Sequence, residues 1–376
     1  MEIAIIGGGI SGLSMSLALA KLGIQSTVYE RAEDLSEVGA GLWLQPNALR
    51  VLQWLGIEDE ILKAGFVLNK MEIAYPNLKA VKEVNSNVVA DRFGNQTVAI
   101  HRARLQAILL EKVKAVAKVE LGMPYLGHEQ KGDQIEIQFE NAKRKADWII
   151  GADGIKSKLR GSLGFASEYR HTDQICVRGI AQIRLPEALR KEGKELWGPK
   201  RRFGFSHISE DQVYFFAVLN TEISPAEINI ESLQKMYADF DPVVNQIIRA
   251  TDFVHSTELA DLKRLDSWHK DQACLIGDAA HATTPNMGQG ACQGIEDAYY
   301  LAQLIHKEAP NLTEAFKDFE AQRRAKVDYV VNNSWRFGQL VHKPWGQFLL
   351  KSIMKITPEK VVKGQLEKLY EIETEV

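Results

Sequence analysis

The fold of this protein follows from the sequence Ile3-Ala4-Ile5-Ile6-Gly7-Gly8-Gly9-Ile10-Ser11-Gly12. The four apolar residues predict a buried strand, and the spaced glycines after it predict a tight turn that opens a helix. A second predicted strand, Ser26–Tyr29, ends at Glu30 and Arg31. A βαβ unit that binds a dinucleotide typically has this order: a strand, a G-x-G-x-x-G turn, a helix, and a second strand that ends at an acidic residue.

The residues of this turn have predicted roles in holding a nucleotide. Gly7 makes the turn, Gly9 lets the backbone reach a pyrophosphate, and Gly12 lets the helix pack on the strand. Glu30 accepts hydrogen bonds from an adenosine ribose, and an acid there disfavours a 2′-phosphate, so the tightly bound nucleotide is FAD or NAD rather than NADP. The candidate cofactor contacts here are Gly7, Gly9, Ile10, Ser11, Gly12, Glu30 and Arg31.

A second glycine-rich stretch, residues 277–292, follows the apolar strand Ala273–Ile276. It places the carboxylate of Asp278 at a strand end and then opens a helix whose unpaired N–H groups carry partial positive charge. Such a segment could bind a cofactor. The carboxylate would accept hydrogen bonds from sugar or polyol hydroxyls, and the helix start would bind an anionic ring or a phosphate. The alternative is a plain strand–loop–helix connection with incidental glycines.

A third apolar strand, ending near Gly151, leads into Asp153 and Gly154. We expect its tip to meet the other two at one crevice, where ligands bind in open α/β sheets. Arg102, at a predicted helix start, either reaches the pyrophosphate or is a solvated surface residue. Further candidate cofactor contacts, before a second helix and at the start of a strand hairpin, are Gly41, Trp43 and Tyr125.

Composition argues against several classes of protein. The 376 residues are 45% hydrophobic and 25% charged with a net charge of −3, which is typical of a globular protein and gives no basic surplus for nucleic acid. The three cysteines fit neither a disulfide framework nor a metal site. We find no signal peptide and no apolar run of about 18 residues, so we expect a cytoplasmic monomer or homodimer without a membrane span.

Three ordered motifs resemble those of the class A flavoprotein monooxygenases, the single-component aromatic hydroxylases. They are the glycine turn with Glu30, the segment Gly151–Arg160 and the segment Gly277–Gly290. The resemblance implies that FAD is the cofactor, that Asp278 binds its ribityl chain and that Arg102 lies at its pyrophosphate. It also implies that Asp153 and Gly154 serve both FAD and the nicotinamide. The helix start that would face the pyrimidine edge of the flavin comprises Gly288, Gln289, Gly290, Ala291 and Cys292.

The resemblance further implies a reaction. NADH or NADPH reduces FAD, O2 then forms a flavin C4a-hydroperoxide, and a hydroxyl group passes to a small aromatic or heteroaromatic substrate. The loop at Pro285 would form a wall of the site of oxygen transfer. Two alternatives stay open: a flavin oxidase or dehydrogenase without oxygen transfer, and a non-catalytic binding protein on the same dinucleotide fold.

The fold that the resemblance implies is α/β, with a Rossmann-like FAD-binding domain of the glutathione-reductase type, an inserted β-sheet domain and C-terminal helices. We expect the discontinuous FAD-binding domain to comprise residues 1–70, 95–165 and 266–340. Residues 71–94 and 166–265 would form the substrate-binding sheet, because apolar and alternating runs typical of strands recur there. Residues 341–376 would form a helical tail.

The inserted sheet carries two candidate catalytic residues, Arg202 and Tyr214, and Pro285 is the third candidate. A three-residue turn at 209–211 would pair residue 208 with 212 and place Arg202 and Tyr214 on one face. The flanking sequence resembles the FAD-dependent urate hydroxylases, in which the matching positions meet the substrate. The alternative is a salt-bridged surface arginine and a core tyrosine. His207 would point to the opposite face, and we expect His281 to be a packing residue rather than a base.

The C-terminal part of the chain is predicted to be helical. Glu314–Val341 has an apolar stripe, with Arg323 and Arg324 expected outside it. Trp345–Tyr370 is amphipathic and carries basic residues, and we expect it to form a helix lying on the FAD-binding domain. Attachment to a membrane surface is the alternative.

Overall fold

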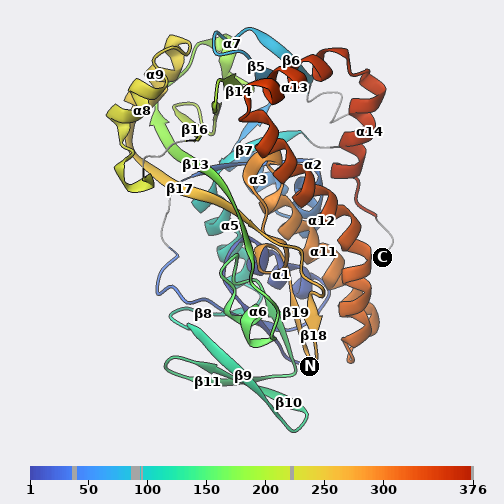
Figure 1. Ribbon diagram of the computed structural model, residues 1–376. Helices are drawn as coiled ribbons and strands as arrows, with labels where there is room; N and C mark the ends of the chain where they lie inside the picture. Colours follow the sequence, from blue (N-terminus) through green and yellow to red (C-terminus); the bar gives the residue numbers. More distant parts are fainter. Residues whose placement is uncertain (36–39, 86–93, 95, 221–223, 374–376) are drawn as a thin grey trace.

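The computed structural model describes residues 1–35, 40–85, 94, 96–220 and 224–373. Figure 1 shows one large sheet in the upper half of the molecule, a second large sheet below it, and long C-terminal helices along one side. Part of the predicted substrate-binding segment, residues 86–93, lies outside the described residues, as does residue 95 at a predicted domain boundary. The two large sheets determine where the functional site lies.

The lower sheet has six strands in the order β18-β19-β12-β1-β2-β8, and every neighbouring pair except β18–β19 is parallel. Its strands are β1 (Ile3–Ile6), β2 (Ser26–Tyr29), β8 (Lys118–Glu120), β12 (Trp148–Gly151), β18 (His269–Lys270) and β19 (Ala273–Leu275). Because the strands are parallel, the turns after β1, β12 and β19 emerge at the same edge. The predicted convergence of three strand ends is therefore confirmed.

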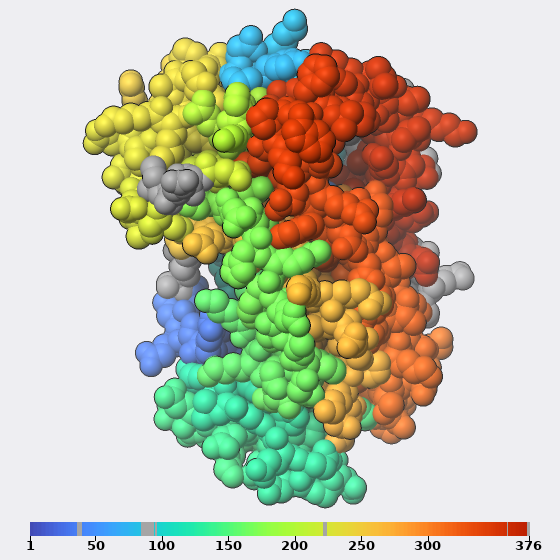
Figure 2. Space-filling model, viewed as in Figure 1, coloured from blue at the N-terminus to red at the C-terminus, as the bar shows by residue number. Residues whose placement is uncertain are grey.

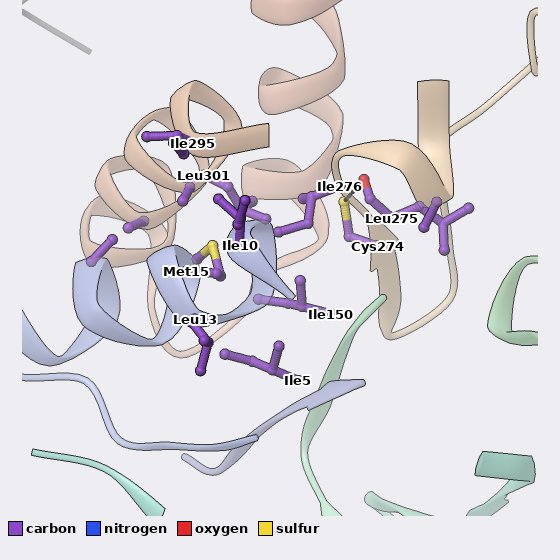
Figure 3. Packing of buried hydrophobic residues seen from close by; sticks show 14 of the residues in the cluster. Ile5, Ile10, Leu13, Met15, Ile150, Cys274, Leu275, Ile276, Ile295 and Leu301 are labelled. Carbon is purple, nitrogen blue, oxygen red and sulfur yellow. Dashed lines mark hydrogen bonds between the residues drawn. The ribbon is translucent and has the colours of Figure 1, made fainter. Parts of the chain in front are cut away.

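Helix α1 (Ile10–Lys21) packs between this sheet and α11 (Gly290–Glu308). Figure 3 shows Ile5 and Ile150 of the sheet facing Leu13 of α1, with Ile295 of α11 beyond, and all four side chains are buried. Such continuous apolar strands are expected where helices cover a parallel sheet. The first βαβ unit is thus held to α11, which begins at the glycine-rich loop.

The upper sheet has seven strands in the order β17-β13-β16-β15-β14-β5-β6, and only β14 and β5 pair in parallel. Its strands are β5 (Lys70–Ala74), β6 (Ala80–Asn85), β13 (Tyr169–Gln182), β14 (Glu192–Gly198), β15 (Arg201–His207), β16 (Gln212–Leu219) and β17 (Thr251–Leu262). Phe203 and Phe215 on one face pack with residues of α8 (Ile230–Met236) and α9 (Pro242–Arg249). The opposite face is left to border a cavity.

Two small sheets and several short helices complete the fold. The sheets are β3 (Gly41–Leu44), β7 (Thr97–His101) and β4 (Phe66–Leu68), and β9 (Tyr125–Lys131), β10 (Gln134–Phe139) and β11 (Lys143–Ala146). The helices are α2 (Pro46–Leu55), α3 (Glu58–Ala64), α5 (Arg102–Lys114), α6 (Lys158–Ser162), α7 (Glu187–Arg190) and α10 (Asp278–His281). Trp43 of β3 donates its indole N–H to Ser206 Oγ of β15 at 2.8 Å, so the first small sheet is tied to the seven-stranded sheet.

Helix α12 (Thr313–Val341) has the predicted extent, but the expectation that Arg323 lies outside the core is wrong. Arg323 is fully buried, its Nε donates to Asp297 Oδ1 at 2.8 Å, and its Nη1 donates to the Glu296 carboxylate. Two carboxylates on α11 thus compensate the buried guanidinium. The period of apolar residues along α12 carries no information about these partners on another helix.

The tail forms two helices, α13 (Pro344–Ile356) and α14 (Glu359–Tyr370), rather than the predicted one. Pro358 has no N–H and disfavours helical backbone at Thr357, whose φ of −65° and ψ of 119° end α13. Gln347 of α13 donates to the Gly198 carbonyl oxygen at 2.8 Å, so α13 lies against the seven-stranded sheet. Helix α14 contacts α2 and α12. Within the described part of the chain, no helix is long and apolar enough to cross a membrane.

Candidate functional site

A cavity of about 950 Å³ lies between the strand ends of the six-stranded sheet and the open face of the seven-stranded sheet. This volume is at the upper end of the range for ligand sites, which is roughly 300–1,000 Å³. The predicted cofactor contacts that line the cavity are Gly7, Gly9, Ile10, Ser11, Glu30, Arg31, Gly41, Trp43, Arg102, Tyr125, Asp153, Gly154, Asp278, Pro285, Gly288, Gly290 and Ala291. Three other predicted contacts, Gly12, Gln289 and Cys292, do not line it.

The first glycine turn has the geometry that its sequence predicts. Gly7 has a φ of 111°, and a Cβ on it would lie 2.4 Å from the Ala152 carbonyl oxygen. A Cβ on Gly12 would lie 2.0 Å from the Gly7 carbonyl oxygen, so α1 and the turn leave no space for a side chain there. A Cβ on Gly9, by contrast, would meet nothing within 4 Å. Gly7 and Gly12 therefore build the turn, and Gly9 leaves room for a ligand.

Glu30, at the end of β2, holds the glycine turn and also lines the cavity. Its Oε2 accepts a hydrogen bond from Gly8 N at 2.6 Å, and its Oε1 accepts one from Ala32 N at 2.9 Å. These bonds fix the carboxylate, and each oxygen keeps a lone pair for a further donor. The arrangement fits the predicted contact with ribose hydroxyls.

Two other carboxylates face the cavity with acceptor capacity to spare. Asp153 Oδ2 accepts hydrogen bonds from the N–H groups of Lys158 and Leu159, whereas its Oδ1 is buried without a partner among the described residues. Asp278 is exposed to the cavity, and no residue in the described ranges donates a hydrogen bond to it. Burial by the surrounding protein raises the pKa of Asp278, against smaller opposing effects of His281 and Arg102. Hydroxyl or amide donors of a ligand would satisfy both carboxylates.

The loop before α11 is held by two side chains that the sequence did not single out as site residues. Residues 285–287 form a short 3₁₀ turn, η2 (Pro285–Met287), and Gly288 follows with a φ of 64°. Gln45 Nε2 donates to the Met287 carbonyl oxygen at 3.0 Å, and Asn47 Nδ2 donates to Gln289 Oε1 at 3.0 Å. The Gln289 side chain thus supports the loop from behind, while Gly288, Gly290 and Ala291 line the cavity. The sequence feature that could have pointed to Gln45 and Asn47 was their position at the start of the predicted helix that became α2.

His281 is a packing residue, as predicted, and it belongs to a buried ionic cluster. Its Nε2 lies 2.6 Å from Asp297 Oδ2, which also accepts from Gly277 N at 2.9 Å. Burial opposes the charge on Asp297, but His281 and Arg323 outweigh that effect and lower its pKa to about 2. The cluster therefore ties the turn after β19 to α11 and α12.

The hairpin of β15 and β16 has the predicted register, with Arg202 opposite Val218 and Ser206 opposite Tyr214. Tyr214 lines the cavity and packs on Gly41, where a Cβ would lie 2.3 Å from the Tyr214 Cγ. No described residue forms a hydrogen bond with the Tyr214 hydroxyl. Burial raises the pKa of this phenol, so it stays protonated and can donate a hydrogen bond.

Two arginines border the cavity from this sheet, and they differ in how their charge is compensated. Arg202 Nη1 lies 2.8 Å from Glu195 Oε1, its Nε donates to His342 Nε2 at 3.1 Å, and its Nη2 donates to Asn286 Oδ1. Arg178 of β13 has the thiol of Cys176 as its neighbour but forms no ion pair with any described carboxylate. The sequence prediction missed Arg178, although period-2 alternation along β13 was the signal that could have found it.

These features fit FAD. Gly9 and Gly154 leave open backbone for a pyrophosphate, since a Cβ on either would meet nothing within 4 Å. Arg102 lines the same cavity at the start of α5 and supplies a cation. The carboxylates of Asp153 and Asp278 offer acceptors for hydroxyl groups, and the start of α11 offers unpaired N–H groups. A dinucleotide on this edge would leave the face of the seven-stranded sheet for a second, smaller molecule.

Comparison with known proteins agrees with this geometry. The family described as FAD binding domain matches residues 1–334. Aurachin C monooxygenase/isomerase from Stigmatella aurantiaca is 31% identical, over 90% of this chain and 89% of the relative. The 2-heptyl-3-hydroxy-4(1H)-quinolone synthase of Pseudomonas aeruginosa is 30% identical, over 95% of this chain and 94% of the relative.

Among solved structures, the fold is similar to that of Klebsiella pneumoniae HpxO complexed with FAD and uric acid. The TM-score is 0.88 with 24% identity, over 98% of this chain and 96% of that one. The chain therefore belongs to the FAD binding domain family and is a class A flavoprotein monooxygenase, an enzyme that binds FAD and uses NAD(P)H.

Proposed function

We propose that this enzyme hydroxylates an electron-rich aromatic or heteroaromatic ring that carries an anionic or enolate-like oxygen. The observation that supports this substrate class is an uncompensated cation, Arg178, on the same cavity-facing sheet as the unpartnered hydroxyl of Tyr214. A cation and a hydrogen-bond donor can hold the oxygen of such a ring and fix the position of the reacting carbon. The Pseudomonas relative supports the class, because its name contains a hydroxylated quinolone ring.

Arg202 and Pro285 are proposed to act beside the substrate, together with Tyr214. Arg202 joins three elements: β14 through Glu195, η2 through Asn286, and the end of α12 through His342. Burial, aided by Arg202, lowers the pKa of His342 to about 3, so the ring is neutral and its Nε2 can accept from Arg202. Because Glu195 compensates the charge of Arg202, we assign Arg202 to positioning the loop at Pro285 and Arg178 to the substrate anion.

The remaining residues prepare the site for the cofactor. FAD, when bound, supplies hydride acceptance from NADH or NADPH and the activation of O2. Asp153 and Asp278 would orient the cofactor through its hydroxyl groups, and the start of α11 would favour negative charge on its reduced ring. Phe216 and Val218 present apolar surface to the cavity and would exclude water from the reacting ring.

We also propose the division of the chain that its sequence suggests. Residues 1–70, 95–165 and 266–340 would hold FAD, residues 71–94 and 166–265 the substrate, and 341–376 would cover the two. Support comes from the seven-stranded sheet, whose strands span residues 70–85 and 169–262. A cytoplasmic location is proposed as well, supported by three cysteines that are all unpaired.

The test is the consumption of NADH and NADPH with a panel of phenols, purines and quinolones, while hydroxylated product and free peroxide are measured separately. We expect one class of ring to give product in near-equal amount to the nicotinamide consumed. Arg178→Gln and Tyr214→Phe should lower the product formed per nicotinamide by about 10-fold or more, because a ring misplaced by ~1 Å can lose ~100-fold in rate.

The control is Arg201→Gln, next to Arg202 in sequence, because Arg201 pairs with Asp239 at the surface. It should leave the product formed per nicotinamide unchanged. If no ring yields product and peroxide alone accumulates, the proposed substrate class is wrong.

A further inference from the structure

Helix α13 turns most of its bulky apolar side chains away from the protein. Five of them are between 45% and 79% exposed, which far exceeds the exposure of the core. They recur at intervals of one, three and four residues and so share one side of the helix. These residues, here named the α13 stripe, are Trp345, Phe348, Leu349, Ile353 and Ile356.

The side of α13 that faces the protein combines the small Gly346 and the polar Gln347, both buried, with the half-buried Leu350 and Met354. Gly346 is buried against the Leu340 carbonyl oxygen, which a Cβ would approach to 2.3 Å. Gln347 is buried as well and donates to the carbonyl oxygens of Gly198 and Val341. A surface helix ordinarily buries its apolar side chains, whereas α13 leaves five of its bulky ones exposed. An exposed apolar surface of this kind marks a site of interaction.

Positive charge flanks the α13 stripe. Residues 343–358 contain three lysines and neither aspartate nor glutamate. None of Lys343, Lys351 and Lys355 forms an ion pair with a carboxylate among the residues that the structure describes. The ammonium groups of Lys351 and Lys355 lie 4.5 and 5.4 Å from the ring centre of Tyr75, and that of Lys343 lies 6.0 Å from the ring centre of Trp345. Lys351 is turned toward the protein, where its Nζ donates to the Trp197 carbonyl oxygen at 3.0 Å, whereas Lys343 and Lys355 are exposed. The charges of Lys343 and Lys355 are therefore available to an anionic partner.

We propose that α13 docks on the surface of a lipid bilayer that contains anionic lipids. Apolar side chains, including a tryptophan, on one side of a helix with lysines beside them are the pattern of helices that lie in the membrane interface. The stripe would enter the boundary of the acyl chains, and Lys343 and Lys355 would lie among the headgroups. Figure 2 shows the red segment that contains α13 at the surface of the molecule, where a bilayer can reach it.

The end of α13 lies beside the cavity. Lys82 of β6 and Leu366 of α14 are among the residues that line the cavity. Lys82 Nζ donates to the carbonyl oxygen of Thr357, the residue that ends α13, at 3.4 Å. A docked bilayer would therefore lie close to the rim of the cavity, and an aromatic substrate dissolved in lipid could enter there. This consequence rests on the proposed function, whereas the docking itself does not.

The experiment is flotation of the FAD-loaded enzyme with vesicles of phosphatidylcholine alone, or with roughly a third of phosphatidylglycerol added. We expect the wild type to float with the anionic vesicles and less with the neutral ones, since the lysines beside the stripe are attracted to an anionic surface. Phe348→Ser combined with Ile356→Ser should weaken binding by about 100-fold, because each lost apolar side chain is worth ~10-fold.

The control is Phe253→Ser, since Phe253 is 65% exposed on β17, outside the stripe. It should float like the wild type, and all variants should keep their FAD content and melting temperature, because the replaced side chains are exposed. Three outcomes would overturn the proposal: a wild type that stays with neither vesicle, equal losses in Phe253→Ser and the stripe variant, or a lipid-free dimer that Phe348→Ser dissociates. Nicotinamide consumption without vesicles tests the proposed function separately.

Discussion

The six-stranded and seven-stranded sheets border the same cavity through different parts of the chain. The six-stranded sheet contributes strand ends, where Gly7 and Gly9 bring backbone to the ligand. The seven-stranded sheet contributes side chains from the middle of its strands, among them Arg178 and Tyr214. Recognition by backbone requires glycines at fixed spacing, whereas recognition by side chains requires only the correct face of a strand. The first kind of site tolerates few substitutions, and the second can be changed to suit another substrate.

The largest effect is expected for Arg323→Met, on the cofactor side of the molecule. Asp297 and Glu296 would stay buried with less charge to compensate them, and breaking such a cluster costs about 3–5 kcal/mol. Denaturant unfolding should show this loss of free energy, together with weaker FAD retention. Arg336→Met is the matched control, because Arg336 is exposed on the same helix. Equal losses in the two variants would show that the cluster does not support the cofactor side.

The same cluster predicts a dependence of stability on pH. The pKa of Asp297 is about 2 in the folded protein, below its ordinary value of ~3.9. A carboxyl group with a lowered folded pKa stabilises the fold above its unfolded pKa, and this contribution, on the order of 2–3 kcal/mol, is lost as pH falls from ~4 through ~2. Urea unfolding between pH 6 and pH 2 should show the loss. Asp297→Asn should make the curve shallower, and an unchanged slope would contradict the assignment.

A smaller effect is expected where backbone alone builds the site. Gly12→Ala places a Cβ 2.0 Å from the Gly7 carbonyl oxygen, and such overpacking costs about 1–3 kcal/mol. Because the turn must shift, FAD retention should fall with the melting temperature. Gly127→Ala is the control, since a Cβ on Gly127 in β9 would meet nothing within 4 Å. If Gly12→Ala binds FAD as the wild type does, the turn is less constrained than its geometry implies.

The sequence revealed the features that depend on neighbours in the chain. Strand, glycine turn and helix are contiguous around Gly7, and the register of β15 and β16 follows from the three residues between them. The ends of β12 and β19 could be placed because each is a short apolar strand that leads into an acid, Asp153 or Asp278. The α/β fold and the FAD crevice could therefore be predicted.

The features that the sequence did not reveal depend on contacts between distant segments. Burial of Arg323 requires carboxylates on α11, and compensation of Arg202 requires Glu195 and Asn286 from two other elements. Arg178 lies on a strand whose neighbours, β16 and β17, come later in the chain. For α13, the sequence pattern predicted that apolar and polar residues lie on different sides of the helix, but it did not predict which side faces the protein.

We infer that the six-stranded sheet binds FAD and the seven-stranded sheet binds the substrate. This division is tested most directly by the dissociation constant of FAD in two variants, measured by titration of the flavin-free protein. Asp278→Ala should weaken FAD binding by about 10- to 100-fold, because a charged acceptor worth ~1.5–3 kcal/mol is lost at the strand ends. Arg178→Gln should leave the constant within about twofold of the wild type, because its side chain lies on the substrate face. An Arg178→Gln variant that loses FAD as readily as Asp278→Ala would contradict this division.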